Sequence, residues 1–197
     1  MASNAKLTRE DLWSLEQYAE QRPDFRNQVI AHKKNRQVHL GQHATLYFED
    51  AITMKYQVQE MLRVERIFEA AEIEEELAAY NPLIPDGGNW KATFMIEYGD
   101  AEERRIALTK MSGIENKVWV QVGDGAKVYA TANEDLQRSN DEKAAAVHFM
   151  RFELSANDIA GARAGSGIRM GIDHDALPYA VDVPASAAAS LAQDLTA

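Results

Sequence analysis

The sequence is 197 residues long and carries a formal net charge of −10 at pH 7. Its hydrophobic fraction of 46% and charged fraction of 26% are those of a globular protein, so the composition excludes a wholly disordered chain. Because the sequence has no cysteine, it excludes disulfides, a thiol nucleophile, zinc–thiolate sites and cysteine-held iron–sulfur clusters in this chain.

The sequence contains no apolar run of the roughly 18 residues that a membrane span needs, and residues 1–6 lack the apolar core of a signal peptide. These features predict a cytoplasmic protein that does not enter a membrane. The negative charge argues against general binding to nucleic acid, because affinity for the phosphate backbone comes mainly from Lys and Arg.

The first fifty residues are expected to contain two short helices and two short strands. Residues Thr8–Asp11 resemble a capping box, in which the Thr side chain and an acid three residues later bond the free amides of a helix start. Pro23 suits the first turn of a second helix, because its missing N–H is not needed there. Strands are expected at residues 37–40 and 44–49.

The longest predicted helix runs from Ala51 to Ala79. It ends before the loop 81–88, which holds two prolines and two glycines. Residues Trp90–Tyr98 alternate apolar and polar side chains, the pattern of a strand with one buried face. A further helix is expected from Ala101 to Met111.

The second half of the chain is expected to be richer in strands. Gly123-Asp124-Gly125 is a hairpin signal between two apolar runs, and residues 134–143 are polar enough for a turn. Four strands are expected in this half, at residues 117–122, 126–131, 145–154 and 168–173.

Together these elements predict an α+β fold, with a mostly antiparallel sheet, helices packed on one face and one long central helix. The single domain is expected over residues 6–183. Residues 1–5 are expected to be an extension, and the Ala- and Ser-rich residues 184–197 a loosely docked short helix or tail.

Seven segments spread along the chain carry a resemblance to one bacterial family. They are Lys6–Leu12, Val29–Lys34, Leu46–Asp50, Tyr56–Arg63, Ala79–Gly87, Arg138–Lys143 and Val147–Glu153. On these segments the sequence resembles the domain-of-unknown-function family 3501, and the resemblance spans most of the chain, from about residue 6 to 175.

The resemblance implies a cellular context and no catalytic residues, because the family has no established activity. Genes of this family often lie beside genes for a rubrerythrin-like di-iron protein and an iron–sulfur protein. The resemblance therefore implies partners of these two kinds and a role in peroxide or redox handling. Since this chain has no cysteine, the redox centre is expected to lie in a partner.

Glu65, His148 and Arg151 are the candidate catalytic residues. Glu65 falls inside the apolar stripe of the helix expected over 51–79, which is formed by Met54, Val58, Met61, Leu62, Val64 and Phe68. His148 is the single polar residue on the apolar face of the strand expected over 145–154. Arg151 lies on the other face of that strand. If the helix packs on the strand, Glu65 and His148 meet, and such a pair either orients a general base or stabilises the core.

Lys33, Lys34 and Arg36 are the candidate binding residues. With His32, His39 and His43 they form a basic cluster in an acidic chain, suited to a phosphate, a nucleotide or the acidic face of a partner. The alternative is a solvated helix end whose cations complement the helix dipole.

The sequence assigns no metal ligand and no cofactor, since it contains neither H-E-x-x-H nor paired E-x-x-H motifs. Two hypotheses for the function follow. The first is a non-enzymatic accessory or interaction protein for a rubrerythrin-like and iron–sulfur redox system. The alternative is a small-molecule or metal-dependent enzyme with Glu65, His148 and Arg151 in a pocket between helix and sheet. A homodimer is left open by both.

Overall fold

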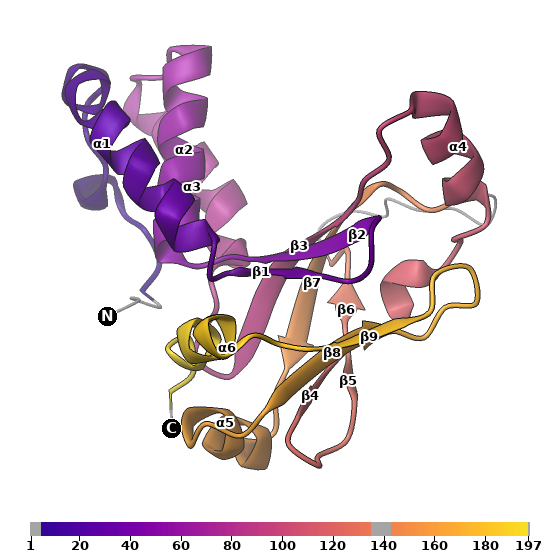
Figure 1. Ribbon diagram of the computed structural model, residues 1–197. Helices are drawn as coiled ribbons and strands as arrows, with labels where there is room; N and C mark the ends of the chain where they lie inside the picture. Colours follow the sequence, from indigo (N-terminus) through magenta and orange to yellow (C-terminus); the bar gives the residue numbers. More distant parts are fainter. Residues whose placement is uncertain (1–4, 135–142, 197) are drawn as a thin grey trace.

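A computed structural model describes residues 5–134 and 143–196, and this part of the chain folds into six α-helices and two antiparallel sheets (Figure 1). The helices are α1 (Leu15–Lys33), α2 (Ala51–Glu65), α3 (Ala70–Tyr80), α4 (Ala101–Thr109), α5 (Ala156–Arg163) and α6 (Ala185–Ala192). The strands are β1 (Gln37–His39), β2 (Ala44–Phe48), β3 (Asn89–Ile96), β4 (Val118–Val122), β5 (Val128–Tyr129), β6 (Thr131–Ala132), β7 (Val147–Glu153), β8 (Ile168–Ile172) and β9 (Tyr179–Asp182).

The two sheets share one apolar core. Strands β1-β2-β3-β7-β6 form one sheet and β5-β4-β8-β9 the other, with every neighbouring pair antiparallel. Buried side chains of both sheets belong to a single cluster, in which Trp90, Phe152, Val120 and Met170 take part. The α+β class and the antiparallel pairing are therefore confirmed.

Strand β3 shows why the alternation of apolar and polar residues predicted a strand with one buried face. Trp90, Ala92, Phe94 and Ile96 are buried, while Lys91, Thr93 and Met95 are partly exposed. In the register of β3 with β7, Phe94 lies opposite His148, so the same alternation puts His148 on the core face.

The hairpin expected around residues 123–125 is present. Strands β4 and β5 pair through Val120 and Val128, and Gly123 adopts a positive φ of 52°, which favours glycine. After Ala130 the chain passes to the other sheet, where β6 pairs with β7. The turn expected over 134–143, and with it the segment Arg138–Lys143, lies mostly outside the described residues.

The prediction of one long central helix over 51–79 is wrong, because two helices occupy this stretch. Arg66 ends α2 in the left-handed conformation (φ 58°, ψ 41°). The amide groups of Arg66 and Ile67 both bond the Leu62 carbonyl, which closes the last turn. The sequence contains no Gly or Pro at this point, so local composition did not reveal the break.

The N-terminal helices also differ from expectation. The Thr8–Asp11 capping box is present, but it begins only a short 3₁₀ turn, and α1 then runs without interruption past Pro23 from a cap at Ser14. Ala19 and Pro23 are both on the exposed side of α1, where water can bond the Ala19 carbonyl that Pro23 leaves unpaired.

Helices α1, α2 and α3 lie together at one end of the molecule (Figure 1) and have a core of their own. Its buried side chains include Met54, Val58, Leu62 and Leu77. The first three come from the stripe predicted for the helix beginning at Ala51. Val64, assigned to the same stripe, is 62% exposed.

The C-terminal segment is docked more firmly than its composition suggests. In α6 and the turn after it, Leu191 and Asp194 are fully buried, and Trp90 donates its indole N–H to the Leu191 carbonyl at 2.9 Å. The small alanines let α6 approach the core closely, Ala187 being buried as well. Strand β9 was not expected from the sequence.

Candidate functional site

The structure does not bring Glu65 and His148 together. Glu65 is exposed in the last turn of α2, a helix that packs against α1 and α3. His148 is fully buried in β7, where Nε2 lies 2.9 Å from the Ala145 carbonyl and Nδ1 lies 3.0 Å from the Asn133 amide nitrogen. Because a carbonyl only accepts, Nε2 carries the proton and Nδ1 accepts from Asn133. His148 is thus hydrogen-bonded within the core.

Arg151 lies on the opposite face of β7, beside a surface hollow of about 340 Å³. Its guanidinium bonds both oxygens of Glu134, at 2.9 and 2.8 Å, and Glu153 at 2.5 Å. The Glu134 hydrogen bonds raise the pKa of Arg151 above its ordinary value. Arg151 is therefore held in ion pairs on the surface of the sheet.

The basic cluster of the sequence is divided in the structure. Lys34 is exposed and Lys33 partly exposed at the end of α1, whereas Arg36 is fully buried. His39 bonds Thr45 on the neighbouring strand. The three candidate binding residues thus do not form one surface.

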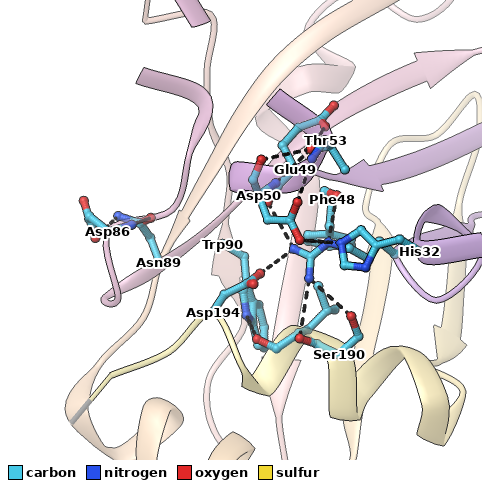
Figure 2. A network of polar contacts seen from close by, with 12 residues as sticks. His32, Phe48, Glu49, Asp50, Thr53, Asp86, Asn89, Trp90, Ser190 and Asp194 are labelled. Atoms are coloured by element: carbon cyan, nitrogen blue, oxygen red, sulfur yellow. Dashed lines mark hydrogen bonds and ion pairs between the residues drawn. The ribbon is translucent and has the colours of Figure 1, made fainter. Parts of the chain in front are cut away.

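Arg36 is the centre of a buried polar network. Figure 2 shows its partners Phe48, Glu49, Asp50, Ser190 and Asp194 gathered around one guanidinium. Its Nε donates to the Phe48 carbonyl at 3.2 Å, and its Nη2 donates to the Glu49 carbonyl at 3.0 Å and to Asp194 Oδ2 at 2.5 Å. Nη1 lies 3.3 Å from the Ser190 hydroxyl. One guanidinium therefore joins the end of β2 to the C-terminal segment.

Asp50 extends this network to α1 and α2. Its Oδ1 caps α2 by accepting the Thr53 amide at 2.9 Å, while its Oδ2 lies 2.5 Å from His32 Nε2 and 3.3 Å from Arg36 Nε. Burial alone would raise the pKa of Asp50, but the His32 hydrogen bond, the Arg36 charge and the Thr53 amide together lower it. Asp50 is thus held as a carboxylate.

The pKa of Asp194 shifts in the opposite direction, although Asp194 also contacts Arg36. Its burial outweighs the attraction of the guanidinium and raises its pKa from 3.8 to about 6. The network therefore contains one carboxyl group whose pKa is lowered and one whose pKa is raised. The sequence offered a signal for Asp50, which precedes a helix as an N-cap, and none for Asp194.

An apolar groove of about 1090 Å³ lies between the N-terminal segment and the turn from α2 to α3. Phe68, one of its lining residues, is 70% exposed. Phe68 was expected in a buried stripe, and it is exposed because the chain leaves the helix at Arg66. The apolar lining consists of Leu12, Trp13, Leu15, Leu62, Ile67, Phe68 and Ile73.

Within residues 5–134 and 143–196, no helix is long and apolar enough to cross a membrane. The same residues contain no group of three His, Asp or Glu side chains arranged to hold a metal ion.

Comparisons with known proteins identify the family. The model of a family described as "protein of unknown function (DUF3501)" matches residues 6–195. A crystal structure of a novel protein of unknown function from Burkholderia pseudomallei is 48% identical, with a TM-score of 0.93, and the match covers 98% of this chain and 100% of that one. No curated protein matches. The chain therefore belongs to the DUF3501 family.

Proposed function

We propose that this protein is a cytoplasmic, non-enzymatic accessory protein that binds a redox partner through the groove between the N-terminal segment and the α2–α3 turn. The observation that carries the proposal is Phe68, a large aromatic side chain that is 70% exposed beside an apolar groove. A large aromatic side chain exposed beside an apolar groove is an arrangement typical of protein interaction sites.

The energetics favour Phe68 as the anchor of an interface. Burying a Phe side chain contributes about 1.5–3 kcal/mol from the removal of apolar surface from water. Aromatic residues in apolar pockets dominate many protein interfaces for this reason. Trp13 and Ile73 line the same groove, so a partner side chain that enters it meets further apolar surface.

The charges around the groove indicate the chemistry of the partner segment. Glu10, Glu16 and Glu74 line the groove together with a single cation, Arg9. Helix α3 adds the exposed Glu72 and further acids along its length. An amphipathic helix with basic residues beside its apolar face complements both features, by apolar contact in the groove and by charge at the rim.

The family context supports a redox partner, and the rubrerythrin-like protein is our first choice. A protein without cysteine cannot hold an iron–sulfur cluster through thiolates, so it would act on a centre located in its partner. The proposed role is to dock on the partner and modulate or assemble it. The iron–sulfur protein is the second partner to test.

Titration of the purified protein with each purified partner by isothermal calorimetry tests the proposal. Phe68→Ser should weaken binding about tenfold or more, because it removes the anchor. Ile106→Ser is the matched control, since Ile106 is a 45% exposed apolar residue on α4 and does not line the groove.

Two results would overturn the proposal: neither partner binds, or Phe68→Ser and Ile106→Ser bind equally well. Sedimentation velocity of the protein alone would reveal whether a second copy occupies the groove instead.

The alternative function, an enzyme built on Glu65, His148 and Arg151, would need these three side chains in one pocket. These three side chains lie, respectively, on an exposed helix end, in the core and in surface ion pairs.

A further inference from the structure

A second hollow, of about 510 Å³, lies between α1 and the beginning of α2. Phe25, Gln28 and His32 line it from one face of α1, and Ile52 and Lys55 line it from α2. Its volume is in the range of ordinary small-ligand sites, roughly 300–1,000 Å³. It shares no lining residue with the groove assigned to the partner protein.

His32 presents a defined nitrogen at this hollow. Asp50 is fully buried, and both of its oxygens are engaged, so it accepts from His32 Nε2 as a fixed carboxylate. The proton of a neutral His32 must therefore lie on Nε2, which leaves Nδ1 as an acceptor. Among the described residues, Nδ1 of His32 has no hydrogen-bond partner.

Lys55 supplies a positive charge to the same hollow. Its ammonium lies 3.8 Å from the Trp13 ring centroid and 5.8 Å from that of Phe25, so it is stacked on aromatic faces. No hydrogen-bond acceptor for Lys55 occurs in the part of the chain that the structure describes. The charge of Asp11 acts on Lys55 across the same hollow and raises its pKa against the larger lowering effect of burial, but its three N–H donors remain open to a hydrogen bond with a ligand.

We propose that this hollow binds a small organic acid that carries one carboxylate and one hydroxyl group on an apolar body. The carboxylate accepts hydrogen bonds from Lys55, and the hydroxyl group donates to Nδ1 of His32. The apolar body lies against Phe25 and Ile52.

Asp11 restricts the ligand to one negative charge. It also lines the hollow, and its carboxylate accepts the amide and hydroxyl of Thr8 at 2.8 and 2.9 Å. The Thr8 amide hydrogen bond lowers the pKa of Asp11, so Asp11 stays charged. It offsets part of the Lys55 charge and therefore disfavours a ligand with more than one negative charge. A monoanion is therefore preferred.

Titration with 4-hydroxyphenylacetate, followed by amide chemical shifts in NMR spectra, tests the site. We expect saturable shifts in residues 25–32 and 51–55. Phenylacetate lacks the hydroxyl group and 4-hydroxyphenylacetamide lacks the carboxylate, so each should bind about tenfold more weakly. Absence of saturable binding up to about 10 mM would overturn the proposal.

Four variants locate the binding. His32→Gln and Lys55→Met should each weaken it about tenfold, whereas Lys34→Met, an exposed lysine outside the hollow, should leave it unchanged. Because His32→Gln also disturbs Asp50, Ile52→Trp serves as the second test: it adds volume at a 37% exposed position and should block the hollow without touching the network. Binding that survives Lys55→Met and Ile52→Trp would show that the probe binds elsewhere.

Discussion

At the scale of single residues, Arg36 is the side chain whose role changed most between sequence and structure. In the sequence it stands next to Lys33 and Lys34 and shares their charge, so it was assigned to a binding surface. In the structure it is fully buried and contacts two carboxylates. Buried cations are stable in proteins only when they are paired and hydrogen-bonded, and Arg36 meets both conditions.

Replacing Arg36 by Met should destabilise the fold by about 3–5 kcal/mol, because it leaves Asp50 and Asp194 buried without their cation. Urea denaturation measures the loss. Lys34→Met removes an exposed lysine two residues earlier and should change the free energy of unfolding by less than about 0.5 kcal/mol. Equal effects of the two substitutions would contradict the buried network.

Asp194 should make the stability depend on pH. Its native pKa of about 6 lies above its ordinary value of 3.8, so folding favours the protonated form. The contribution of this group to the free energy of unfolding therefore rises as the pH falls through 6, and it is lost again above that pH. From pH 7 to pH 5, the wild type should gain about 1 kcal/mol relative to Asp194→Asn. A difference that stays constant with pH would show that the pKa is not raised.

At the scale of secondary-structure elements, the break at Arg66 has the largest consequence. It ends α2, reverses the chain into α3 and leaves Phe68 exposed at the groove. A left-handed conformation costs a non-glycine residue about 1 kcal/mol, so tertiary packing of the two helices must outweigh local preference here.

Arg66→Gly should therefore stabilise the protein by about 0.5–1 kcal/mol, because glycine adopts this conformation without strain. Arg63→Gly is the matched control: Arg63 is an exposed residue within α2, where glycine should destabilise by about 1 kcal/mol. Thermal and urea unfolding of both variants check the opposite signs. Destabilisation by both would mean that α2 and α3 are one helix in solution.

The elements that sequence patterns located best are those with one buried face. The alternation in Trp90–Tyr98 and in residues 145–154 gave β3 and β7, because every second side chain enters the core. Helix boundaries were harder to predict from the sequence. The break at Arg66 and the passage of α1 through Pro23 depend on packing and solvent contact, which local patterns do not record.

At the scale of the whole molecule, the C-terminal segment completes the fold. Leu191 enters the core that the two sheets share, and Asp194 forms an ion pair with Arg36, which lies just after the end of α1. The Ala-rich sequence of residues 184–197 does not predict that this segment packs on the core, because it has no apolar stripe. Residues 36 and 194 are far apart in the sequence, so no local sequence pattern predicts their contact. The candidate site predicted from the sequence therefore did not include Asp194.

Removal of residues 184–197 should cost on the order of 5 kcal/mol, from the lost burial of Leu191 and the broken ion pair of Arg36. This is comparable to the whole stability of many domains. Circular dichroism and thermal unfolding should show a largely unfolded or strongly destabilised chain, while a chain ending at residue 196 should match the wild type. An unchanged melting temperature after the deletion would mean that α6 is a dispensable tail.

The claim that the molecule binds a redox partner through its groove is tested most directly by hydrogen–deuterium exchange, measured with and without the purified rubrerythrin-like protein. Our account predicts slower exchange in residues 8–16 and 62–74, the two segments that hold the lining residues of the groove, and unchanged exchange in α4 at residues 101–109. Protection confined to other parts of the chain, or no protection at partner concentrations that saturate binding, would contradict it.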